Sequence, residues 1–323
     1  MSAVVSRAIE GPSVWYAHTA IANGGVVSIA DECLTEMHAA IEVLRANPLE
    51  ITALSPADFE LSKCRQMMSE VKTILDDGVG FAILDRLPIE AFSADEAKAI
   101  EWVLMSMLGN TVAQTWTGTL LYDVLDTGRK EELGAGVRGS KTNGGQGYHT
   151  DNSYNLPPDY VALFCLRGSK AGGVSGLVSF AAAHNDLLER NPAALERLFE
   201  PFFFERYKEF APGDSAVSRY PVFSDDNGRL EVRLSTKRVR MGYQAANEEM
   251  DERAVHAMDA LDEVLEDSTL GKSFEFLPGQ IQIINNRKLG HRRTAYEDWP
   301  DAERRRHLVR IWVRKEGRRF YAG

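Results

Sequence analysis

Residues Tyr148–Ser153 read YHTDNS and hold an imidazole and a carboxylate two positions apart. On a β-strand, alternate side chains point to the same face, so His149 and Asp151 are expected to project together, with roughly 6–7 Å of strand rise between their Cα atoms. That spacing suits one small cation. A third donor from a distant strand would complete two histidines and one carboxylate on one side of a metal, and would leave the opposite coordination positions open.

The third donor that we expect is His291, in the stretch Leu289–Thr294 that reads LGHRRT. A His-x-Asp pattern alone is more often a chance match than a metal site, because short motifs occur in many unrelated sequences. The context favours a metal site, since only His149 and His291 occur where an apolar strand pattern meets a glycine-rich or polar loop. Helical, polar or basic surroundings account for the other histidines without a metal: His18, His38, His184, His256 and His307.

The composition is that of an ordinary globular protein of 323 residues, with 44% hydrophobic and 26% charged residues. A formal net charge of −10 argues against nucleic acid as a partner. No stretch approaches the roughly 18 consecutive apolar residues that span a bilayer, and the first ten residues do not read as a secretory signal. We therefore expect a cytoplasmic protein without a membrane partner; self-association is left open. Cys33, Cys64 and Cys165 are widely spaced and odd in number, which predicts free thiols and no Cys-based metal site.

Helical patterns dominate the start of the chain, and β-patterns dominate the rest. Helices are expected over 31–46, from an N-cap at Ser55 to Leu75, and from an N-cap at Ser93 to Leu108, around a strand over 79–84. Further strands are expected over 119–125, 160–166, 176–180, 230–234, 281–285 and 308–313, with helical inserts over 182–202 and 247–266. This pattern predicts a mainly β fold with flanking helices around a double-sheet barrel. The polar, Gly-rich connection over 126–147 predicts a mobile lid over the site.

The basic stretch Arg304–Arg319 has apolar residues interleaved in it, as in a strand. Guanidinium groups on a buried strand need anionic partners, because an unpaired buried charge is very costly. Those partners are either internal Asp or Glu side chains or a bound carboxylate, which arginine binds in a two-pronged way. A period of two residues places Arg306, Leu308, Arg310, Trp312 and Arg314 on one face of the strand, and His307, Val309, Ile311 and Val313 on the other.

The stretch Ala171–Ser179 reads AGGVSGLVS, a Gly-Gly turn that leads into a strand. On its own it is more often a hairpin turn than a functional motif. A hydroxyl at Ser175 close to a buried arginine would nevertheless provide a second hydrogen-bond donor to a carboxylate.

Together these features resemble the taurine dioxygenase/clavaminate synthase-like group of Fe(II)- and 2-oxoglutarate-dependent oxygenases. The resemblance rests on the His-x-Asp segment after a polar loop, the Gly-Gly-x-Ser turn, the distal His before Arg-Arg-Thr, and the Arg-x-x-x-Arg strand. It runs from about Val79 to Val313, with the segments in the family's order. It implies a double-stranded β-helix (jelly-roll, cupin-like) core over 79–323, with a helical preface over 1–78, in a single oxygenase domain over 1–323.

The resemblance also implies a role for each matched residue. His149, Asp151 and His291 would bind Fe(II). Arg306 would pair with the distal carboxylate of 2-oxoglutarate, assisted by Ser175 where relatives commonly have threonine. Arg310 matches a position that in some relatives binds the anion of the substrate and in others helps to hold the co-substrate, and the sequence does not separate these two roles.

The implied reaction consumes dioxygen and 2-oxoglutarate, releases succinate and carbon dioxide, and hydroxylates an unactivated C–H bond of a small molecule. Asp151 favours hydroxylation over halogenation, because halogenating relatives have a small residue in its place. Desaturation and ring closure are alternatives with the same cofactors. A non-catalytic metal-binding jelly-roll protein is a further alternative, as is an oxygenase that modifies protein or nucleic acid, although no reader domain or basic groove is visible in the sequence.

Neutral hydrogen-bonding groups and an aromatic pair surround the His-x-Asp segment. They suggest a small polar substrate, such as an amino-acid derivative or a natural-product intermediate. Hydrogen bonding to loop backbone is an equal alternative for the asparagines, which often serve turns. The candidate substrate residues are Asn143, Gln146, Tyr148, Asn152, Tyr154 and Asn155, together with Arg310.

Overall fold

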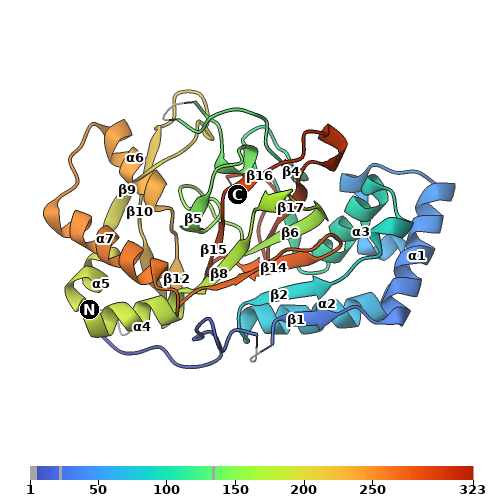
Figure 1. Cartoon of the computed structure of the whole chain (residues 1–323), viewed down its shortest axis with the longest axis horizontal. Helices are drawn as coiled ribbons and strands as arrows, with labels where there is room; N and C mark the ends of the chain where they lie inside the picture. Colours follow the sequence, from blue (N-terminus) through green and yellow to red (C-terminus); the bar gives the residue numbers. More distant parts are fainter. Residues whose placement is uncertain (1–5, 22–23, 133–134, 323) are drawn as a thin grey trace.

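The computed structural model describes residues 6–21, 24–132 and 135–322, and it places two β-sheets between two groups of helices (Figure 1). The larger sheet has the strand order β1-β2-β14-β6-β17-β3, with β4 also paired to β17. Only the pairing of β1 with β2 is parallel among the described strands of this sheet. Its strands are β1 (Val26–Ser28), β2 (Phe81–Asp85), β3 (Asn110–Val112), β4 (Tyr122–Val124), β6 (Tyr160–Arg167), β14 (Ile281–Asn285) and β17 (His307–Arg314).

The smaller sheet has the order β13-β8-β15-β5, with antiparallel pairings throughout. It packs on the larger sheet through one hydrophobic cluster, in which Phe81 and Trp312 of the larger sheet join Leu177 and Leu289 of the smaller one. Its strands are β5 (Gln146–His149), β8 (Ser175–Ser179), β13 (Lys272–Phe274) and β15 (Leu289–Arg293). Three further antiparallel pairs are β9 (Pro201–Glu205) with β10 (Val217–Pro221), β11 (Phe223–Asp226) with β12 (Arg229–Val232), and β7 (Ala171–Gly172) with β16 (Tyr296–Glu297).

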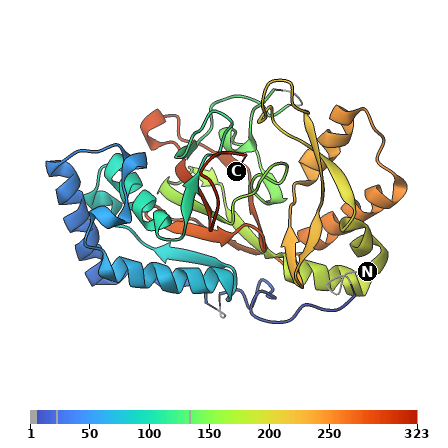
Figure 2. The ribbon, with the colours of Figure 1, turned by 180° about the vertical axis from the view of Figure 1, so that it is seen from behind.

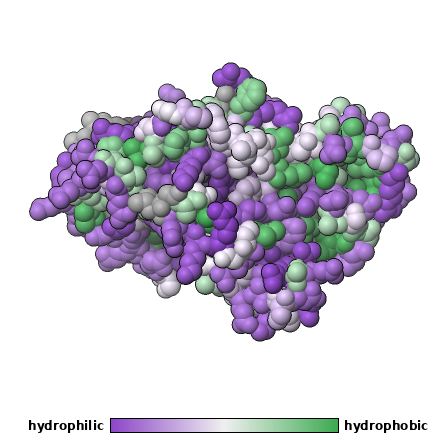
Figure 3. Space-filling model, turned by 90° about the horizontal axis from the view of Figure 1, so that it is seen from above, coloured by the Kyte–Doolittle hydropathy of each residue, from purple (hydrophilic) through white to green (hydrophobic). Residues whose placement is uncertain are grey.

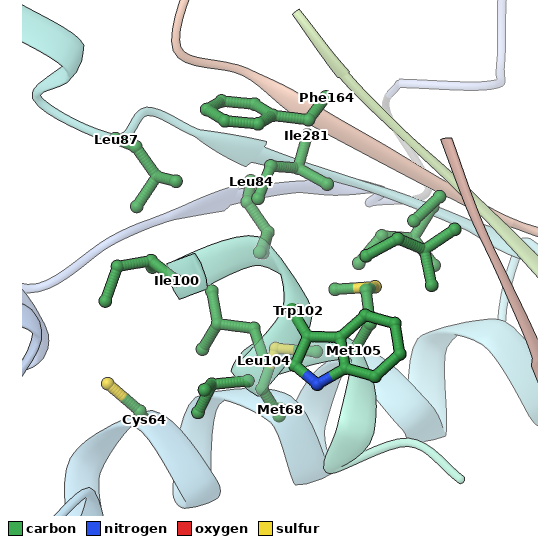
Figure 4. Close-up of a cluster of buried hydrophobic side chains, with 14 of the residues drawn as sticks. Cys64, Met68, Leu84, Leu87, Ile100, Trp102, Leu104, Met105, Phe164 and Ile281 are labelled. Carbon is green, nitrogen blue, oxygen red and sulfur yellow. The ribbon is translucent and has the colours of Figure 1, made fainter. Parts of the chain in front are cut away.

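The helices form two groups at opposite ends of the sheets, which are also visible from behind (Figure 2). The first group is α1 (Asp31–Ala46), α2 (Ser62–Asp76) and α3 (Ala94–Ser106). It packs on the larger sheet, where Met68 and Trp102 lie near Leu84, Phe164 and Ile281 (Figure 4). The second group is α4 (Phe180–Arg190), α5 (Pro192–Leu198), α6 (Thr236–Ala246) and α7 (Glu252–Glu266), and α4, α5 and α7 form one hydrophobic cluster with β9.

Strand β17 separates the first helical group from the interior of the molecule, as its two-residue period predicted. Val309, Ile311 and Val313 belong to the hydrophobic cluster of α1, α2 and α3. Arg310 and Trp312, on the opposite face, line an internal cavity. The strand therefore carries the cavity wall on one face and the packing of the helical group on the other.

Two helices were predicted with the wrong bounds, because the residues that cap them begin or end a shorter element. Ser55 does form a capping box, but with Asp58 of a short 3-10 turn over Pro56–Asp58, and α2 begins only at Ser62. The helix predicted over 182–202 is interrupted at Asn191, which ends α4 and caps α5. Pro192 follows, and proline has no N–H with which to continue a helix.

The region around 247–266 also differs from the expectation. The helix begins at Glu252, after Asp251 accepts a hydrogen bond from the backbone N–H of Ala254. Asn247 instead ends a helix that was not predicted, α6, in the left-handed conformation that favours asparagine or glycine at a helix C-terminus. The helices predicted over 31–46 and after Ser93 are confirmed, the latter with a capping box between Ser93 and Glu96.

The fold is a mixed α/β fold, so the prediction of a mainly β chain is wrong in its proportions. The α-helices hold more of the described residues than the strands do. The central strands were predicted well, since β14 coincides with 281–285 and β6 extends the expected strand by Arg167 alone. Short strands without a clear apolar alternation, such as β1 and β9, were missed. All three cysteines are free and buried, as expected.

Hydrophilic side chains cover most of the face that is seen from above, with hydrophobic ones interspersed among them (Figure 3). Among the described residues, no helix is both long enough and apolar enough to cross a membrane.

Glu101 of α3 is buried in the first helical group, and neither of its carboxylate oxygens has a hydrogen-bond partner among the described residues. Burial raises the pKa of this carboxyl well above its ordinary value of 4.5. Folding therefore takes up a proton, and the stability of the fold decreases as the pH rises above about 4.5. We expect Glu101→Gln to raise the Tm, and to raise it more at pH 8 than at pH 5, as measured by calorimetry. The exposed Glu90→Gln is the control; an equal gain at both pH values would contradict this explanation.

Candidate metal centre and cavity

The structure brings His149, Asp151 and His291 together at one end of a cavity. Nε2 of each histidine lies 3.8 Å from Oδ1 of Asp151, and the centroids of the two imidazole rings are 4.2 Å apart. One donor atom from each of the three side chains lies within 4.8 Å of the other two. These residues are the only group of at least three His, Cys, Asp or Glu side chains in the described ranges with donor atoms this close. A single ion can reach all three donors.

The pairing of β5 with β15 places the two histidines side by side, because His149 and His291 are directly opposite in the register. Gly290 lets β15 pack closely against β8 and the start of α4: a Cβ atom at this position would lie 2.8 Å from Cγ1 of Val178 and 2.7 Å from Cζ of Phe180. Asp151 does not lie on the strand, contrary to the expectation, because β5 ends at His149 and a turn follows. The turn, rather than strand alternation, brings the carboxylate back toward the imidazoles.

Asn286 holds the backbone of Asp151 on both sides of the residue. The N–H of Asp151 donates to Oδ1 of Asn286 at 2.8 Å, and Nδ2 of Asn286 donates to the carbonyl of Asp151 at 3.0 Å. Asn286 is fully buried directly after β14. One side chain of the larger sheet therefore sets the position of the turn that carries the carboxylate.

Two groups on β17 fix the carboxylate of Asp151. Nε1 of Trp312 donates to Oδ2 at 2.8 Å, and Nη1 of Arg310 lies 3.0 Å from Oδ2 and 3.3 Å from Oδ1. Burial alone would raise the pKa of this carboxyl, but Arg310, His291 and His149 outweigh it and lower the pKa to about 2. The carboxylate is therefore ionised at neutral pH.

Both imidazoles can present Nε2 to a metal. Nδ1 of His149 lies 2.9 Å from the carbonyl oxygen of Gly147, an acceptor, so the ring proton belongs on Nδ1 and the lone pair on Nε2. Burial, reinforced by His149, lowers the pKa of His291 to about 3, which keeps this imidazole neutral. Two imidazoles and one carboxylate are thus available as donors.

The donor group opens into a cavity of about 350 Å³, a volume typical of small-ligand sites. Arg306 and Ser175 line this cavity together with the donor group. Arg306 is 6% exposed, and no described carboxylate lies within ion-pair distance of its guanidinium. Its Nη1 is buried without a hydrogen-bond partner in the described part of the chain, and burial lowers the pKa of the group.

Arg310 is more fully engaged than Arg306. Besides the contact with Asp151, its Nε donates to Oε1 of Gln114 at 2.8 Å, and Gln114 donates back to the backbone carbonyl of Arg310 at 2.6 Å. Only Nη2 is buried without a partner among the described atoms. Arg310 can therefore offer the N–H groups of Nη2 to a ligand. Its anchor, Gln114, was not predicted from the sequence.

Besides Arg310, four of the candidate substrate residues line the cavity: Gln146, Tyr148, Asn152 and Tyr154. The ring of Tyr148 packs under the guanidinium of Arg292, whose Cζ lies 4.5 Å from the ring centroid. Nδ2 of Asn152 donates to the backbone carbonyl of Leu156 at 2.7 Å, which is the loop role considered for the asparagines.

The other two candidate asparagines lie outside the cavity wall. Asn143 is exposed. Asn155 is engaged in internal bonds, since its Oδ1 accepts from Arg206 and its Nδ2 donates to the backbone carbonyl of Glu209 and to the Tyr321 hydroxyl. Loop anchoring explains Asn155 without a substrate.

The stretch predicted as a lid supplies part of the cavity wall, although residues 133–134 lie outside the described residues. Glu131 accepts a hydrogen bond from the hydroxyl of Tyr207 at 2.6 Å, and Arg138 forms an ion pair with Glu209 at 2.6 Å. Tyr207 and Glu209 belong to the loop between β9 and β10, which the sequence did not mark as functional. The two loops are thus joined over the cavity, and the mobility of the lid stays a prediction.

The sequence matches the family model described as taurine catabolism dioxygenase TauD, TfdA family, over residues 47–312. The chain is 27% identical over 325 residues to FR-33289 synthase of Streptomyces rubellomurinus, and the match covers 99% of this chain and 94% of that protein. It is 33% identical over 175 residues to a uridine-5'-phosphate dioxygenase of an Amycolatopsis species, across 53% of this chain and 62% of that protein.

Two solved structures have a similar fold. Asparagine oxygenase in complex with Fe(II), 2S,3S-3-hydroxyasparagine and succinate has a TM-score of 0.66 at 20% identity, and covers 90% of this chain and 94% of its own. The non-haem iron oxygenase OrfP in complex with Fe and α-ketoglutaric acid has a TM-score of 0.66 at 16% identity, with the same coverage.

The fold is similar to that of these two oxygenases, and two histidines with one carboxylate are a donor set that suits non-haem iron. The family match extends over most of the chain, so the protein belongs to the TauD/TfdA family of Fe(II)- and 2-oxoglutarate-dependent oxygenases.

Proposed function

We propose that His149, Asp151 and His291 bind the Fe(II) of this oxygenase. The observation that carries the proposal is the convergence of donors from β5, the turn after it and β15. Two imidazoles and one carboxylate on the same side of an ion are the donor set that suits ferrous iron and leaves positions free for other ligands.

Arg306 and Ser175 would hold the distal carboxylate of 2-oxoglutarate. Arg306 fits this role because it is a buried cation of the cavity wall without a protein anion among the described residues. The hydroxyl of Ser175 donates to Oε1 of Gln282 at 2.9 Å, so it would turn its proton toward the carboxylate on binding. Arg310, whose Nη2 is free, would chiefly orient Asp151 and donate from Nη2 to the co-substrate or to an anionic group of the substrate.

When bound, Fe(II) and 2-oxoglutarate supply the activation of dioxygen that oxidises a substrate C–H bond, with succinate and carbon dioxide as co-products. The chain's own residues position these groups and limit the access of water. Leu163, Phe276 and Leu308 line the cavity with apolar side chains on the side of Arg306. A dry wall there strengthens the attraction between the guanidinium and a carboxylate.

The proposed substrate is a small polar molecule, an amino-acid derivative or a natural-product intermediate, and the proposed reaction is hydroxylation. The cavity of about 350 Å³ has room for a molecule of that size. The similar structures support the class, since that of asparagine oxygenase contains 3-hydroxyasparagine and one of OrfP contains (3S)-hydroxy-L-Arg. We further infer that the two sheets form a double-stranded β-helix within a single oxygenase domain, which is supported by the hydrophobic cluster that joins them.

Anaerobic titration tests the proposal. Adding Fe(II) and then 2-oxoglutarate to the purified protein is expected to produce a weak visible charge-transfer band that saturates at one equivalent of each. Succinate release, screened against amino acids, their derivatives and other small acids, should then identify the substrate. A metal-loaded protein that gives no such band with 2-oxoglutarate, and releases no succinate with any compound, would contradict the proposal.

Ser175→Ala is expected to raise the KM for 2-oxoglutarate only about two- to tenfold, because one neutral hydrogen bond contributes about 0.5–1.5 kcal/mol. The Fe(II) affinity should not change, since Ser175 contacts none of the donor residues through a described hydrogen bond. Steady-state kinetics with 2-oxoglutarate as the varied reactant measure this effect. A KM equal to that of the wild type would remove Ser175 from the co-substrate site.

A further inference from the structure

Tyr321 is buried in a stretch of backbone that is otherwise exposed. Residues 315–320 and Ala322 are exposed after the end of β17, whereas Tyr321 is only 4% exposed. Its side chain is not part of the cavity wall. Its hydroxyl nevertheless forms hydrogen bonds with Asn152 and Asn155, which follow Asp151 in the chain. Tyr321 thereby links residues 315–322 to the candidate metal centre.

The hydroxyl of Tyr321 fixes the turn that carries Asp151. It donates to Oδ1 of Asn152 at 3.1 Å and accepts from Nδ2 of Asn155 at 3.0 Å. Asn152 has a φ of +55°, a left-handed conformation that asparagine adopts more readily than most non-glycine residues, and hydrogen bonds of its side chain fix it there. The phenol supplies part of that support.

The ring of Tyr321 also supports Trp312. The two rings are stacked, with centroids 6.5 Å apart and planes at 19°. The indole N–H of Trp312 is the group that donates to Oδ2 of Asp151. Tyr321 therefore acts on Asp151 along two routes, through the turn at Asn152 and through the indole that holds the carboxylate.

Arg314 fixes the backbone on both sides of this arrangement. Its Nη1 donates to the carbonyls of Phe320 at 2.8 Å and Arg318 at 3.3 Å, and its Nη2 donates to those of Tyr321 at 2.9 Å and Leu156 at 3.1 Å. Backbone carbonyls are thus the hydrogen-bond acceptors of the buried Arg314 guanidinium. The same contacts hold Tyr321 against the segment that follows Asp151.

We propose that Tyr321 is a positioning residue for the metal centre, which sets the orientation of the Asp151 carboxylate without touching the metal or the cavity. The inference rests on the proposed function, in which Asp151 is an iron ligand. Groups that orient a metal ligand typically change metal affinity 10- to 100-fold when they are mutated.

The test is the affinity of the anaerobic apoenzyme for Fe(II), measured by isothermal titration calorimetry. Tyr321→Leu removes both the hydroxyl and the stacked ring, and should weaken Fe(II) binding about tenfold. Tyr321→Phe keeps the ring, and should weaken binding by less than Tyr321→Leu but by more than about twofold. Phe320→Leu is the matched control, because Phe320 is 70% exposed; its Fe(II) affinity should equal that of the wild type.

A merely structural role would lower the Tm of the apoenzyme without changing the Fe(II) affinity of the folded fraction. The inference would therefore be overturned if Tyr321→Phe and Tyr321→Leu bound Fe(II) with affinities within twofold of the wild type. If Tyr321→Leu does not fold, the affinity of Tyr321→Phe alone decides. His291→Ala separates this failure from that of the proposed function: if it binds Fe(II) as tightly as the wild type, the ligand assignment itself is wrong.

Discussion

Replacing Asp151 with alanine is expected to abolish succinate formation and to weaken Fe(II) binding by at least about 100-fold, because a direct ligand contributes more than the outer groups that orient it. The apoenzyme should also be less stable. The carboxylate is the ion-pair partner of Arg310 and the acceptor for Trp312, and leaving a buried charge without its partner costs about 3–5 kcal/mol. Calorimetric Fe(II) titration and thermal unfolding measure the two effects separately.

Asp262→Ala is the control for this experiment, since Asp262 lines the same cavity without belonging to the donor group. It should leave Fe(II) binding unchanged. Asp151→Asn separates charge from shape, because the amide keeps an acceptor for Trp312 but loses the negative charge. Full turnover by Asp151→Ala would contradict the ligand assignment.

Arg306→Leu is expected to have opposite effects on the free and the liganded protein. Without 2-oxoglutarate, the variant should be more stable than the wild type by about 1–4 kcal/mol, because an apolar side chain replaces a buried guanidinium that has no described carboxylate within ion-pair distance. With 2-oxoglutarate, the wild type should gain stability and the variant should not. The loss of a buried charged hydrogen bond costs about 2–5 kcal/mol, roughly 30-fold or more in the affinity for 2-oxoglutarate.

Thermal unfolding with and without 2-oxoglutarate, in the presence of Fe(II), measures both effects. Arg304→Leu is the matched control, since Arg304 is exposed on the same basic stretch and should change neither quantity. A variant Arg306→Leu that is stabilised by 2-oxoglutarate as strongly as the wild type would place the co-substrate elsewhere.

The donor group was found from sequence because its residue types and spacing are unusual, although part of the reasoning was wrong. His-x-Asp was expected to lie on one strand, whereas β5 ends at His149 and a turn returns the carboxylate to the site. The alternation along β17 predicted correctly that Arg306 and Arg310 share a face with Trp312 and that Val309 lies on the other. The residue types therefore identified the donor group even though the assumed strand was wrong there, whereas strand alternation was reliable along β17, where the strand exists.

The residues that the sequence did not reveal act through long-range contacts. Asn286 and Gln114 are ordinary polar residues whose roles depend on partners more than 100 positions away. Arg314 continues the period of Arg306 and Arg310, yet its N–H groups bind backbone carbonyls rather than an anion. Periodicity gives the face of a strand on which a residue lies, but it does not give the partner that tertiary structure brings to that residue.

The most direct test of the metal centre is crystallographic. Anomalous diffraction at the iron absorption edge, from crystals of the protein loaded anaerobically with Fe(II), should show one strong peak within about 2.0–2.2 Å of Nε2 of His149, Nε2 of His291 and a carboxylate oxygen of Asp151, as expected for bonds to a first-row metal. A peak at any other site, or side chains of these three residues that point to separate places, would contradict the account.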